Sequence, residues 1–311
     1  MEGKRFEQII VTVEASIAEV TLDRPERHNA LGSRIVGELG EALEEIEGSG
    51  EIRALVLTGA GDKAFCSGVD LKERAEMDAD GRWTHNRALG AFVGHLARLQ
   101  VPTIAALNGL AFGGGLEIVL ACDFRITAEG ARFSLPEVGI GIVPGAGGTQ
   151  RLPRLIGVTK AKELILTGRR IGAEEALEMG LVSKAVPRSS LMEEARSLAR
   201  EIAANSPLAL AYAKAALDLA PETTIEQGLR YETAAIHATL SSEDYKIGLA
   251  AFAEKRTPAF PPLTSRRITW DSSQTVSLHL HWQTGSAVLR RTRVSLTRTL
   301  PGRIVKLGVE V

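Results

Sequence analysis

Two glutamates and two glycine-containing turns are the residues whose types and spacing fit catalytic chemistry. In residues 108–123, NGLAFGGGLEIVLACD, an apolar strand runs into Gly113–Gly115 and then into helical sequence. Amides that begin a helix lack partners, and glycine places no Cβ in the path of an approaching oxygen, so this turn is typical of an anion pocket. Glu117 lies three residues beyond Gly114, on the same helix face one turn on. We therefore expect a carboxylate beside an oxyanion site.

A second turn, SGVDLKE, has a weaker form of the same arrangement. Gly68 and Val69 follow a loop and open a short helical stretch, which leaves the Val69 amide unpaired. Asp70 is interpreted as the cap of that helix. Together, the amides of Val69 and Gly114 would form an oxyanion hole.

Glu137 is the second acidic candidate, directly after Pro136 in the apolar context SLPEVG. A carboxyl group in apolar surroundings has a raised pKa and can hold or donate a proton near neutral pH. Taken singly, each glutamate is better explained as a solvated surface charge, and the glycine run as tight packing. Two glutamates combined with two free amides instead favour proton transfer next to an enolate.

The elements that must position these groups alternate between strands and helices. The hydrophobic period predicts a helix that starts at a Ser33 cap and ends near Gly48 to Gly50, and the segment beyond Pro144 is predicted to be almost entirely helical. Strands are expected at 9–13, 17–22, 53–58, 103–107, 124–128 and 132–135, and further helices at 70–76, 86–99 and 114–121. This alternation predicts an α/β fold with a mostly parallel sheet.

Composition excludes several classes of protein. The 311 residues carry 37 Lys+Arg and 38 Asp+Glu, and no apolar stretch approaches the roughly 20 residues of a membrane-spanning helix. The N-terminal sequence has no apolar targeting segment, and two cysteines, Cys66 and Cys122, cannot form a disulfide framework. We expect a cytoplasmic protein in which Cys66 is a small core residue, because no histidine motif accompanies it.

The C-terminal tail, residues 264–311, differs in charge from the rest of the chain. It contains eight basic and two acidic residues, so its formal charge is +6. Val276 to Trp282 alternate as in a strand and would place His279 and His281 on one face, but a third metal ligand is lacking nearby. We expect the tail to be poorly ordered and assign it no role.

The strings GVDLKE, GGGLE and PEVGIGIVPGAGGTQRLPR resemble the enoyl-CoA hydratase/isomerase (crotonase) family over about residues 8–260. The resemblance implies a crotonase-like βαβ spiral core with the active site in residues 1–200 and a C-terminal helical trimerisation region in 201–263. It also implies homotrimers, or homohexamers made of two trimers. The string DLKERAEM is similar to the methylglutaconyl-CoA hydratase branch.

The same resemblance implies a hydratase, a carbon–oxygen lyase of fatty acid metabolism. Water would add across the C2=C3 bond of a trans-2-enoyl-CoA to give a 3-hydroxyacyl-CoA, without a metal or other cofactor. Val69 and Gly114 would bind the thioester oxygen, Glu117 would activate the water that attacks C3, and Glu137 would deliver a proton to C2. The family's hydratases carry both glutamates, which favours hydration over isomerisation.

Coenzyme A is expected, again by resemblance, along two segments that flank the oxyanion turn. The implied contacts are Arg24, Arg27, Ser67 and Gly68, with Phe252 and Lys255 near the ribose phosphate, from the same or a neighbouring subunit. Two alternatives stay open. One is a Δ3,Δ2-enoyl-CoA isomerase that uses Glu137 with Glu117 as a helper. The other is a nucleic-acid-binding protein acting through the basic tail, although nucleic acid is the less expected partner.

Overall fold

The computed structural model describes residues 6–263 and two short strands near the C-terminus, β11 (Arg293–Ser295) and β12 (Gly308–Glu310), which pair antiparallel. The chain divides into two units, Met1–Ser265 and Arg266–Val311. The strand expected over Val276 to Trp282 lies outside the described residues, and so do His279 and His281.

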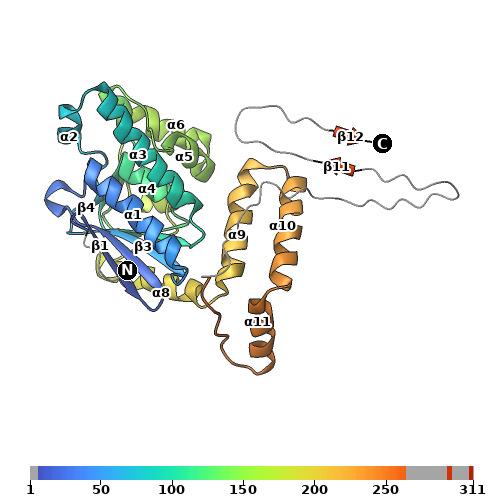
Figure 1. Ribbon diagram of the computed structural model, residues 1–311. Coiled ribbons are helices and arrows are strands. Elements are labelled where there is room, and N and C mark those ends of the chain that lie inside the picture. The colour runs from blue at the N-terminus through green and yellow to red at the C-terminus, as the bar shows by residue number, and fades with distance from the viewer. Residues whose placement is uncertain (1–5, 264–292, 296–307, 311) are drawn as a thin grey trace. The chain divides into compact units, whose positions relative to one another are not determined.

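A six-stranded sheet forms the centre of the larger unit (Figure 1). Its order is β1-β2-β3-β5-β7-β10, and every neighbouring pair except β1 and β2 is parallel. The strand bounds are β1 Ile9–Glu14, β2 Ile17–Leu22, β3 Ala54–Gly59, β5 Thr103–Leu107, β7 Phe124–Ala128 and β10 Lys184–Val186. The predicted α/β class with a crotonase-like spiral core is confirmed.

Both faces of this sheet are covered, because successive side chains of each strand point to opposite sides. One face presents Val56, Ile104 and Ile126 to helix α8 (Leu191–Ala203), which buries Ala195 and Ala199 against them. The other face is part of the main core, where Leu55, Leu57 and Leu107 join the buried residues of helices α1 (Ser33–Ser49), α3 (Ala79–Arg98) and α4 (Gly114–Ala121). Strand β3 is buried at all six positions, as its apolar sequence predicts.

A smaller four-stranded sheet carries the segments that lead into the catalytic candidates. Its order is β4-β6-β8-β9, with bounds β4 Ala64–Cys66, β6 Leu110–Phe112, β8 Arg132–Ser134 and β9 Ile171–Gly172. Strand β6 is the strand expected to run into Gly113–Gly115. Strand β4 is not among the elements expected from the sequence, and β9 and β10 lie in the segment expected to be helical. Strands of two or three residues are too short to show an alternating pattern.

The helices of the spiral core differ from the predictions at two starts. Helix α3 begins at Ala79, with Asp78 as its cap, and not near Asn86. Gly32, not Ser33, is the N-cap of α1, and the Glu73 carboxylate instead accepts hydrogen bonds from the Ser33 amide and hydroxyl. The core helices are α1 Ser33–Ser49, α2 Leu71–Glu76, α3 Ala79–Arg98, α4 Gly114–Ala121, α5 Gly148–Ile156, α6 Val158–Thr167 and α7 Ala173–Glu178, with short 3₁₀ turns η1 Pro25–Arg27, η2 Glu137–Ile140 and η3 Arg188–Ser190.

Three helices follow the core: α9 (Pro207–Leu219), α10 (Ile225–Leu240) and α11 (Glu243–Ala253), with the turn η4 Ala220–Glu222 between the first two. Helices α9 and α10 run side by side, and α10 also contacts α11 (Figure 1). A capping box formed by Thr224 and Gln227 begins α10, yet this helix buries no residue. Among the described residues, no helix combines the length and apolar character needed to cross a membrane.

Candidate active site

Helix α4 starts at the glycine run, as the sequence predicts. Gly113 has φ = 52°, a left-handed conformation that favours glycine, and it turns the chain from β6 into the helix. Gly115 is required for packing, because a Cβ there would lie only 2.4 Å from the Cys66 carbonyl oxygen. All eight residues of α4 are buried, so its first turn opens into the interior of the fold.

Glu117, in the first turn of α4, is 2% exposed. Its Oε1 accepts hydrogen bonds from the backbone amides of Ala146 at 2.7 Å and Gly148 at 2.8 Å. Burial raises the pKa of Glu117, while these two amides and the charge of Arg151 act in the opposite direction. The carboxylate is therefore held in one orientation by donors that favour its ionised form.

Glu137 has a different environment at the start of η2. Its Oε1 lies 3.1 Å from the position that a Cβ on Gly113 would occupy, so the carboxyl group reaches the turn that begins α4. Its Oε2 is buried and has no hydrogen-bond partner among the described residues. Burial, and to a lesser extent the charge of Glu117, raise the pKa of Glu137 to about 7. The raised pKa expected from the sequence is confirmed. Gly113, beside which the Glu137 carboxyl group lies, also accepts the Glu117 amide at its carbonyl oxygen at 3.0 Å, so both glutamates belong to the same turn region.

The two oxyanion candidates lie side by side. A Cβ on Gly68 would be 3.4 Å from the Gly114 amide nitrogen, and a Cβ on Gly114 would be 3.8 Å from Val69 Cγ2. Within residues 6–263, neither the Val69 amide nor the Gly114 amide donates a hydrogen bond. The structure therefore brings together two free amides and two carboxyl groups from the turn after β4, from α4 and from η2.

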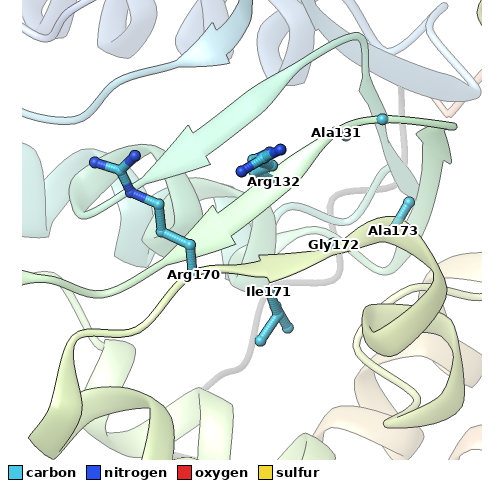
Figure 2. Close-up of a pocket in the computed structure, with 7 residues that line it drawn as sticks. Ala131, Arg132, Arg170, Ile171, Gly172 and Ala173 are labelled. Atoms are coloured by element: carbon cyan, nitrogen blue, oxygen red, sulfur yellow. The ribbon is translucent and has the colours of Figure 1, made fainter.

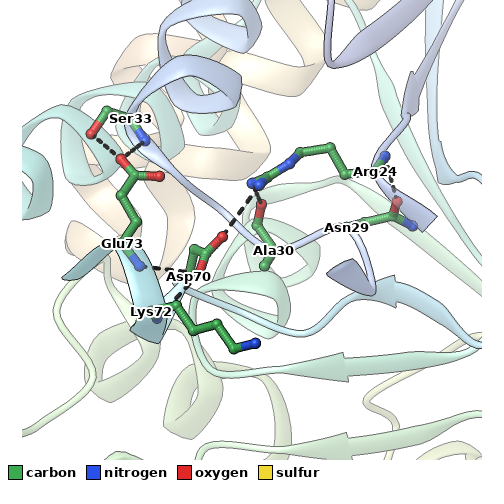
Figure 3. A network of polar contacts seen from close by, with 7 residues as sticks. All are labelled: Arg24, Asn29, Ala30, Ser33, Asp70, Lys72 and Glu73. Atoms are coloured by element: carbon green, nitrogen blue, oxygen red, sulfur yellow. Dashed lines mark hydrogen bonds and ion pairs between the residues drawn. The ribbon is translucent and has the colours of Figure 1, made fainter. Parts of the chain in front are cut away.

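The segment that begins at Arg24 lies against the oxyanion turn. The Ser67 amide donates to the His28 carbonyl oxygen at 3.0 Å, and Arg27, at the end of η1, is exposed. The Arg24 guanidinium points inward, where it donates to the Ala30 carbonyl oxygen and pairs with Asp70 (Figure 3). Arg24, Arg27, Ser67 and Gly68 are thus neighbours, but the charged group of Arg24 is already paired.

Phe252 and Lys255 lie at the end of α11. The Phe252 side chain is 86% exposed, and the Lys255 amide donates to the Phe252 carbonyl oxygen. No hydrogen bond or ion pair within residues 6–263 connects either residue to the Arg24 or Gly68 segment. The structure therefore does not bring these two residues to the other candidates within one chain.

The partners of Glu117 were not predicted from the sequence. Ala146 and Gly148 belong to the string PGAGGT, whose glycines give the backbone room to turn its amides toward a carboxylate. Arg151, on the first turns of α5, donates to the Ala146 carbonyl oxygen at 2.9 Å and so supports the same loop. The glycine density of this string was the one signal that could have identified it.

Cys66 and Asp70 have the structural roles predicted for them. The Cys66 side chain is fully buried, and burial raises the pKa of its thiol to about 12, which leaves it protonated and unreactive at neutral pH. Asp70 Oδ1 accepts hydrogen bonds from the amides of Lys72 and Glu73 and so caps α2. Within the described part of the chain, no group of three or more His, Cys, Asp or Glu residues could hold a metal ion.

A separate hollow of about 290 Å³ lies beside β8 and β9 (Figure 2). Arg132 and Arg170 line it together with Ile171 and four glycine or alanine residues, and the Arg170 guanidinium carbon lies 5.1 Å from the centre of the Phe112 ring. Neither Glu117 nor Glu137 lines this hollow. It is therefore distinct from the place where the carboxyl groups meet.

Comparisons with known proteins show the family of the chain. A sequence model of the family described as "Enoyl-CoA hydratase/isomerase" matches residues 12–262. A curated relative from Clostridium acetobutylicum, named "Short-chain-enoyl-CoA hydratase", is 43% identical over 252 residues, which cover 80% of this chain and 95% of the relative. The human "Enoyl-CoA hydratase domain-containing protein 2, mitochondrial" is 42% identical over 248 residues, 78% of this chain and 85% of the human protein.

A solved structure extends the similarity to three dimensions. The crystal structure of an enoyl-CoA hydratase from Bacillus anthracis is 44% identical to this chain and superposes with a TM-score of 0.80. The alignment covers 82% of this chain and 99% of that one. The residues matched by the family model, 12–262, include both glutamates and both oxyanion candidates.

Proposed function

The chain belongs to the enoyl-CoA hydratase/isomerase family, and on that premise we propose that Glu117 and Glu137 catalyse the addition of water to a trans-2-enoyl-CoA. The product is a 3-hydroxyacyl-CoA. One observation supports the assignment of these two glutamates as the catalytic residues. A carboxylate fixed by two amides lies near a second carboxyl group that has a raised pKa and an unpartnered buried oxygen.

The two glutamates divide the proton transfers. Glu117, whose ionised form is favoured by the Ala146 and Gly148 amides, holds the water and takes its proton as the oxygen attacks C3. Glu137, protonated below its pKa of about 7, gives its proton to C2. Water thus supplies the hydroxyl group on C3, and Glu137 supplies the hydrogen on C2. The proton that Glu117 took from the water then passes to Glu137, which returns both carboxyl groups to their starting states.

The thioester oxygen becomes negatively charged as water adds, and the free amides of Val69 and Gly114 supply hydrogen bonds to it. Each donor of an oxyanion hole typically contributes about 3 kcal/mol to transition-state stabilisation. Donors of this kind act without moving, because the backbone already holds them in place. The roles of these amides rest on their proximity and on their lack of other acceptors within residues 6–263.

The CoA portion is proposed to follow the surface between the Arg24–His28 segment and Ser67–Gly68. Arg27 is exposed there and can bind a phosphate group of CoA. Arg24 begins the segment, but its guanidinium group points inward and pairs with Asp70. Phe252 and Lys255 would complete the ribose phosphate contacts from a neighbouring subunit, since no contact ties them to the site in their own chain. Water addition through two carboxyl groups needs no metal or redox cofactor.

A homotrimer, or a homohexamer of two trimers, is proposed from the C-terminal helices 201–263. These helices expose large apolar side chains that a second copy would cover: Leu217, Ile225, Leu229, Ile236, Leu240, Leu249 and Phe252. Light scattering after gel filtration should give three or six times the 33.3 kDa of one chain. A monomer of full activity would contradict this assembly.

Three further points stay predictions. The first is the division into a spiral core at 1–200, a helical region at 201–263 and a basic tail at 264–311. The others are a cytoplasmic location and a substrate like that of the methylglutaconyl-CoA hydratase branch. The nucleic-acid alternative concerns the tail, most of whose residues lie outside the described part of the chain. Fractionation of the native host followed by immunoblotting tests the location. Deletion of 264–311 tests the tail, because a nucleic-acid role would make a salt-sensitive gel shift depend on it.

The proposed reaction is tested with a panel of CoA thioesters. Purified protein is incubated with crotonyl-CoA, with 3-methylglutaconyl-CoA and with the unconjugated 3-butenoyl-CoA. Products are separated by reversed-phase chromatography against standards and weighed by mass spectrometry, because 3-butenoyl-CoA and crotonyl-CoA have the same mass. Gain of one water by a conjugated thioester supports hydration. Conversion of 3-butenoyl-CoA to crotonyl-CoA without hydration would establish the isomerase alternative, and no turnover of any thioester would overturn the proposal.

A further inference from the structure

The Val69 amide is left free by hydrogen bonds made on either side of it. The Leu31 amide donates to the Gly68 carbonyl oxygen at 2.8 Å, and the Asp70 amide donates to the Leu31 carbonyl oxygen at 3.1 Å. Leu31 and Val69 form an isolated parallel bridge. Because Leu31 engages the residues before and after Val69, the peptide between them can turn only a little, and its N–H keeps one direction.

Leu31 can act in this way only if its own loop is rigid. The backbone at His28 and Asn29 has positive φ angles of 52° and 55°, which residues other than glycine adopt rarely. Asn29 compensates for this strain, because its side-chain Nδ2 donates to the carbonyl oxygens of Ala60 and Ala64, and its Oδ1 accepts from the Arg24 backbone amide. The loop is thus anchored at one end by Asn29.

Arg24 anchors the other end and joins both loops. Its Nη1 donates to the Ala30 carbonyl oxygen at 2.8 Å, and its Nη2 lies 3.3 Å from Asp70 Oδ2 (Figure 3). Ala30 precedes Leu31, and Asp70 follows Val69, so one guanidinium group spans the bridge that orients the free amide. The two side chains are only 14% and 9% exposed, which limits competition from water.

The other carboxylate oxygen of Asp70, Oδ1, accepts hydrogen bonds from helix α2, which follows Asp70 directly. Oδ1 accepts the amides of Lys72 at 3.2 Å and Glu73 at 3.3 Å, so the carboxylate is fixed by α2 while Oδ2 faces Arg24. Glu73 in turn accepts the Ser33 amide at 2.8 Å, which ties α2 to the start of α1 (Figure 3). The Arg24 charge is therefore paired inside this network, which sets it apart from the exposed Arg27.

From this geometry we infer that Arg24 and Asp70 are positioning residues, which hold the Val69 N–H toward the thioester oxygen and do not bind CoA themselves. The inference rests on the proposed function. It depends on the planar fork of arginine, whose two nitrogens reach two acceptors in fixed directions, whereas the single ammonium group of lysine has no such fork. A charge-conserving Arg24→Lys substitution therefore breaks the bridge without removing the positive charge.

Three variants test this role: Arg24→Lys, Asp70→Asn and the double variant. The asparagine side chain keeps an oxygen that can cap α2, so Asp70→Asn removes the ion pair while leaving the helix start in place. Arg196→Lys is the control, because Arg196 makes a two-pronged ion pair with Glu19 on the surface, between α8 and β2 and outside this network. The readouts are kcat, KM for crotonyl-CoA, the dissociation constant of free CoA, and the carbonyl stretching frequency of bound ¹³C-labelled butyryl-CoA.

Wild-type protein should shift the butyryl-CoA carbonyl to lower frequency, since hydrogen bonds weaken the C=O bond. Arg24→Lys should lower kcat by roughly tenfold or more, a part of the 10²–10³ attributed to one oxyanion donor. Its carbonyl frequency should return toward the free value, while the CoA dissociation constant stays within about twofold. Asp70→Asn should act in the same direction, and the double variant should be little worse than Arg24→Lys because both changes break one bridge.

Other outcomes overturn the inference in distinguishable ways. A raised KM and weaker CoA binding with unchanged kcat and carbonyl frequency would make Arg24 a CoA ligand. A lower kcat in a variant whose bound carbonyl keeps the wild-type frequency would give the pair a structural role only. If wild-type protein binds butyryl-CoA without any carbonyl shift, the oxyanion hole of the proposed function fails, and this inference fails with it. Should Arg24→Lys not fold, Asp70→Asn tests the same ion pair with the same readouts.

Discussion

Glu117 and Glu137 carry the same functional group in two contrasting environments. Glu117 is almost fully buried, and one of its oxygens accepts two backbone amides. Glu137 lies at the start of a 3₁₀ turn, is partly exposed, and has a buried oxygen with no partner among the described residues. Burial raises the pKa of both carboxyl groups, but only Glu117 has several donors from another loop that oppose it.

This contrast teaches how one fold obtains a base and an acid from identical side chains. Hydrogen bonds to the ionised form keep Glu117 ready to accept a proton. Burial without such bonds leaves Glu137 ready to donate one near neutral pH. The difference comes from the loop at residues 145–148 and not from the glutamates themselves, so changes in either environment should separate their roles.

The largest expected effect is loss of the carboxyl groups. Glu117→Gln and Glu137→Gln should each lower kcat by about 10²–10⁴-fold, because each removes a proton transfer. KM should change little, since neither carboxyl group binds the CoA portion. A glutamine at position 117 can still accept the Ala146 and Gly148 amides, so the loop should keep its shape. A wild-type rate in either variant would show that the role assigned to that carboxyl group is wrong.

Removal of one oxyanion donor should have the next largest effect. Gly114→Pro removes the amide hydrogen at the first helical position, where proline is otherwise tolerated, and should lower kcat by about 10²–10³-fold. Gly114→Ala is the control: it keeps the N–H and adds a Cβ near Leu31 and Leu89, at 3.2 Å from each. Equal loss in both variants would point to packing and not to the donor.

The pH dependence of activity should report the raised pKa of Glu137. Above about pH 7 the fraction of protonated Glu137 falls, so kcat/KM for hydration should decline toward tenfold per pH unit. Steady-state rates with crotonyl-CoA between about pH 5 and pH 9 would measure this limb. If the limb persists unchanged in the residual activity of Glu137→Gln, another group produces it.

Stability should change with pH in the same direction. Because the pKa of Glu137 is about 7 in the folded chain and near its ordinary value of 4.5 in the unfolded chain, folding favours its protonated form. The contribution is present below about pH 4.5 and is lost as pH rises to about 7, a change of at most about 3 kcal/mol. The free energy of unfolding in urea is measured for wild type and Glu137→Gln at several pH values. All other groups titrate in both proteins, so the difference between the two curves is the contribution of Glu137. Two curves that run parallel between pH 4.5 and 7 would contradict this prediction.

A change at Arg151 should have the smallest effect and act on Glu117 alone. Arg151 supports the Ala146 carbonyl, and its charge lowers the pKa of Glu117. Arg151→Gln should therefore move the acidic limb of kcat/KM to higher pH and reduce activity at neutral pH only a few-fold. Arg154→Gln, on the exposed side of α5, removes a similar charge and is the control. An equal shift in both variants would indicate a general charge effect.

Much of this site could be predicted from the sequence where the signal is local. The glycine run before α4 and the spacing from Gly114 to Glu117 identify a helix start with a carboxylate one turn on, and Asp70 is recognisable as a cap. That Glu137 meets Glu117 follows from the family resemblance, because no local pattern connects residues 20 positions apart.

Contacts between distant segments could not be predicted. The amides that hold Glu117 come from residues 29 and 31 positions later, and backbone donors have no side-chain signal. The local pattern predicts Ser33 as the cap of α1, but the Glu73 carboxylate, 40 residues away, binds the amide at that helix start. Strand β4 is only three residues long and shows no period, although it leads into the turn that holds Val69.

Hydration of crotonyl-CoA in deuterated water tests the central claim most directly. Proton transfer through the two glutamates predicts that wild-type protein forms 3-hydroxybutyryl-CoA with one deuterium at C2, and that Glu117→Gln and Glu137→Gln form it at least about 100-fold more slowly. Rapid hydration by either variant, or recovery of unchanged crotonyl-CoA from the wild-type protein, would contradict it.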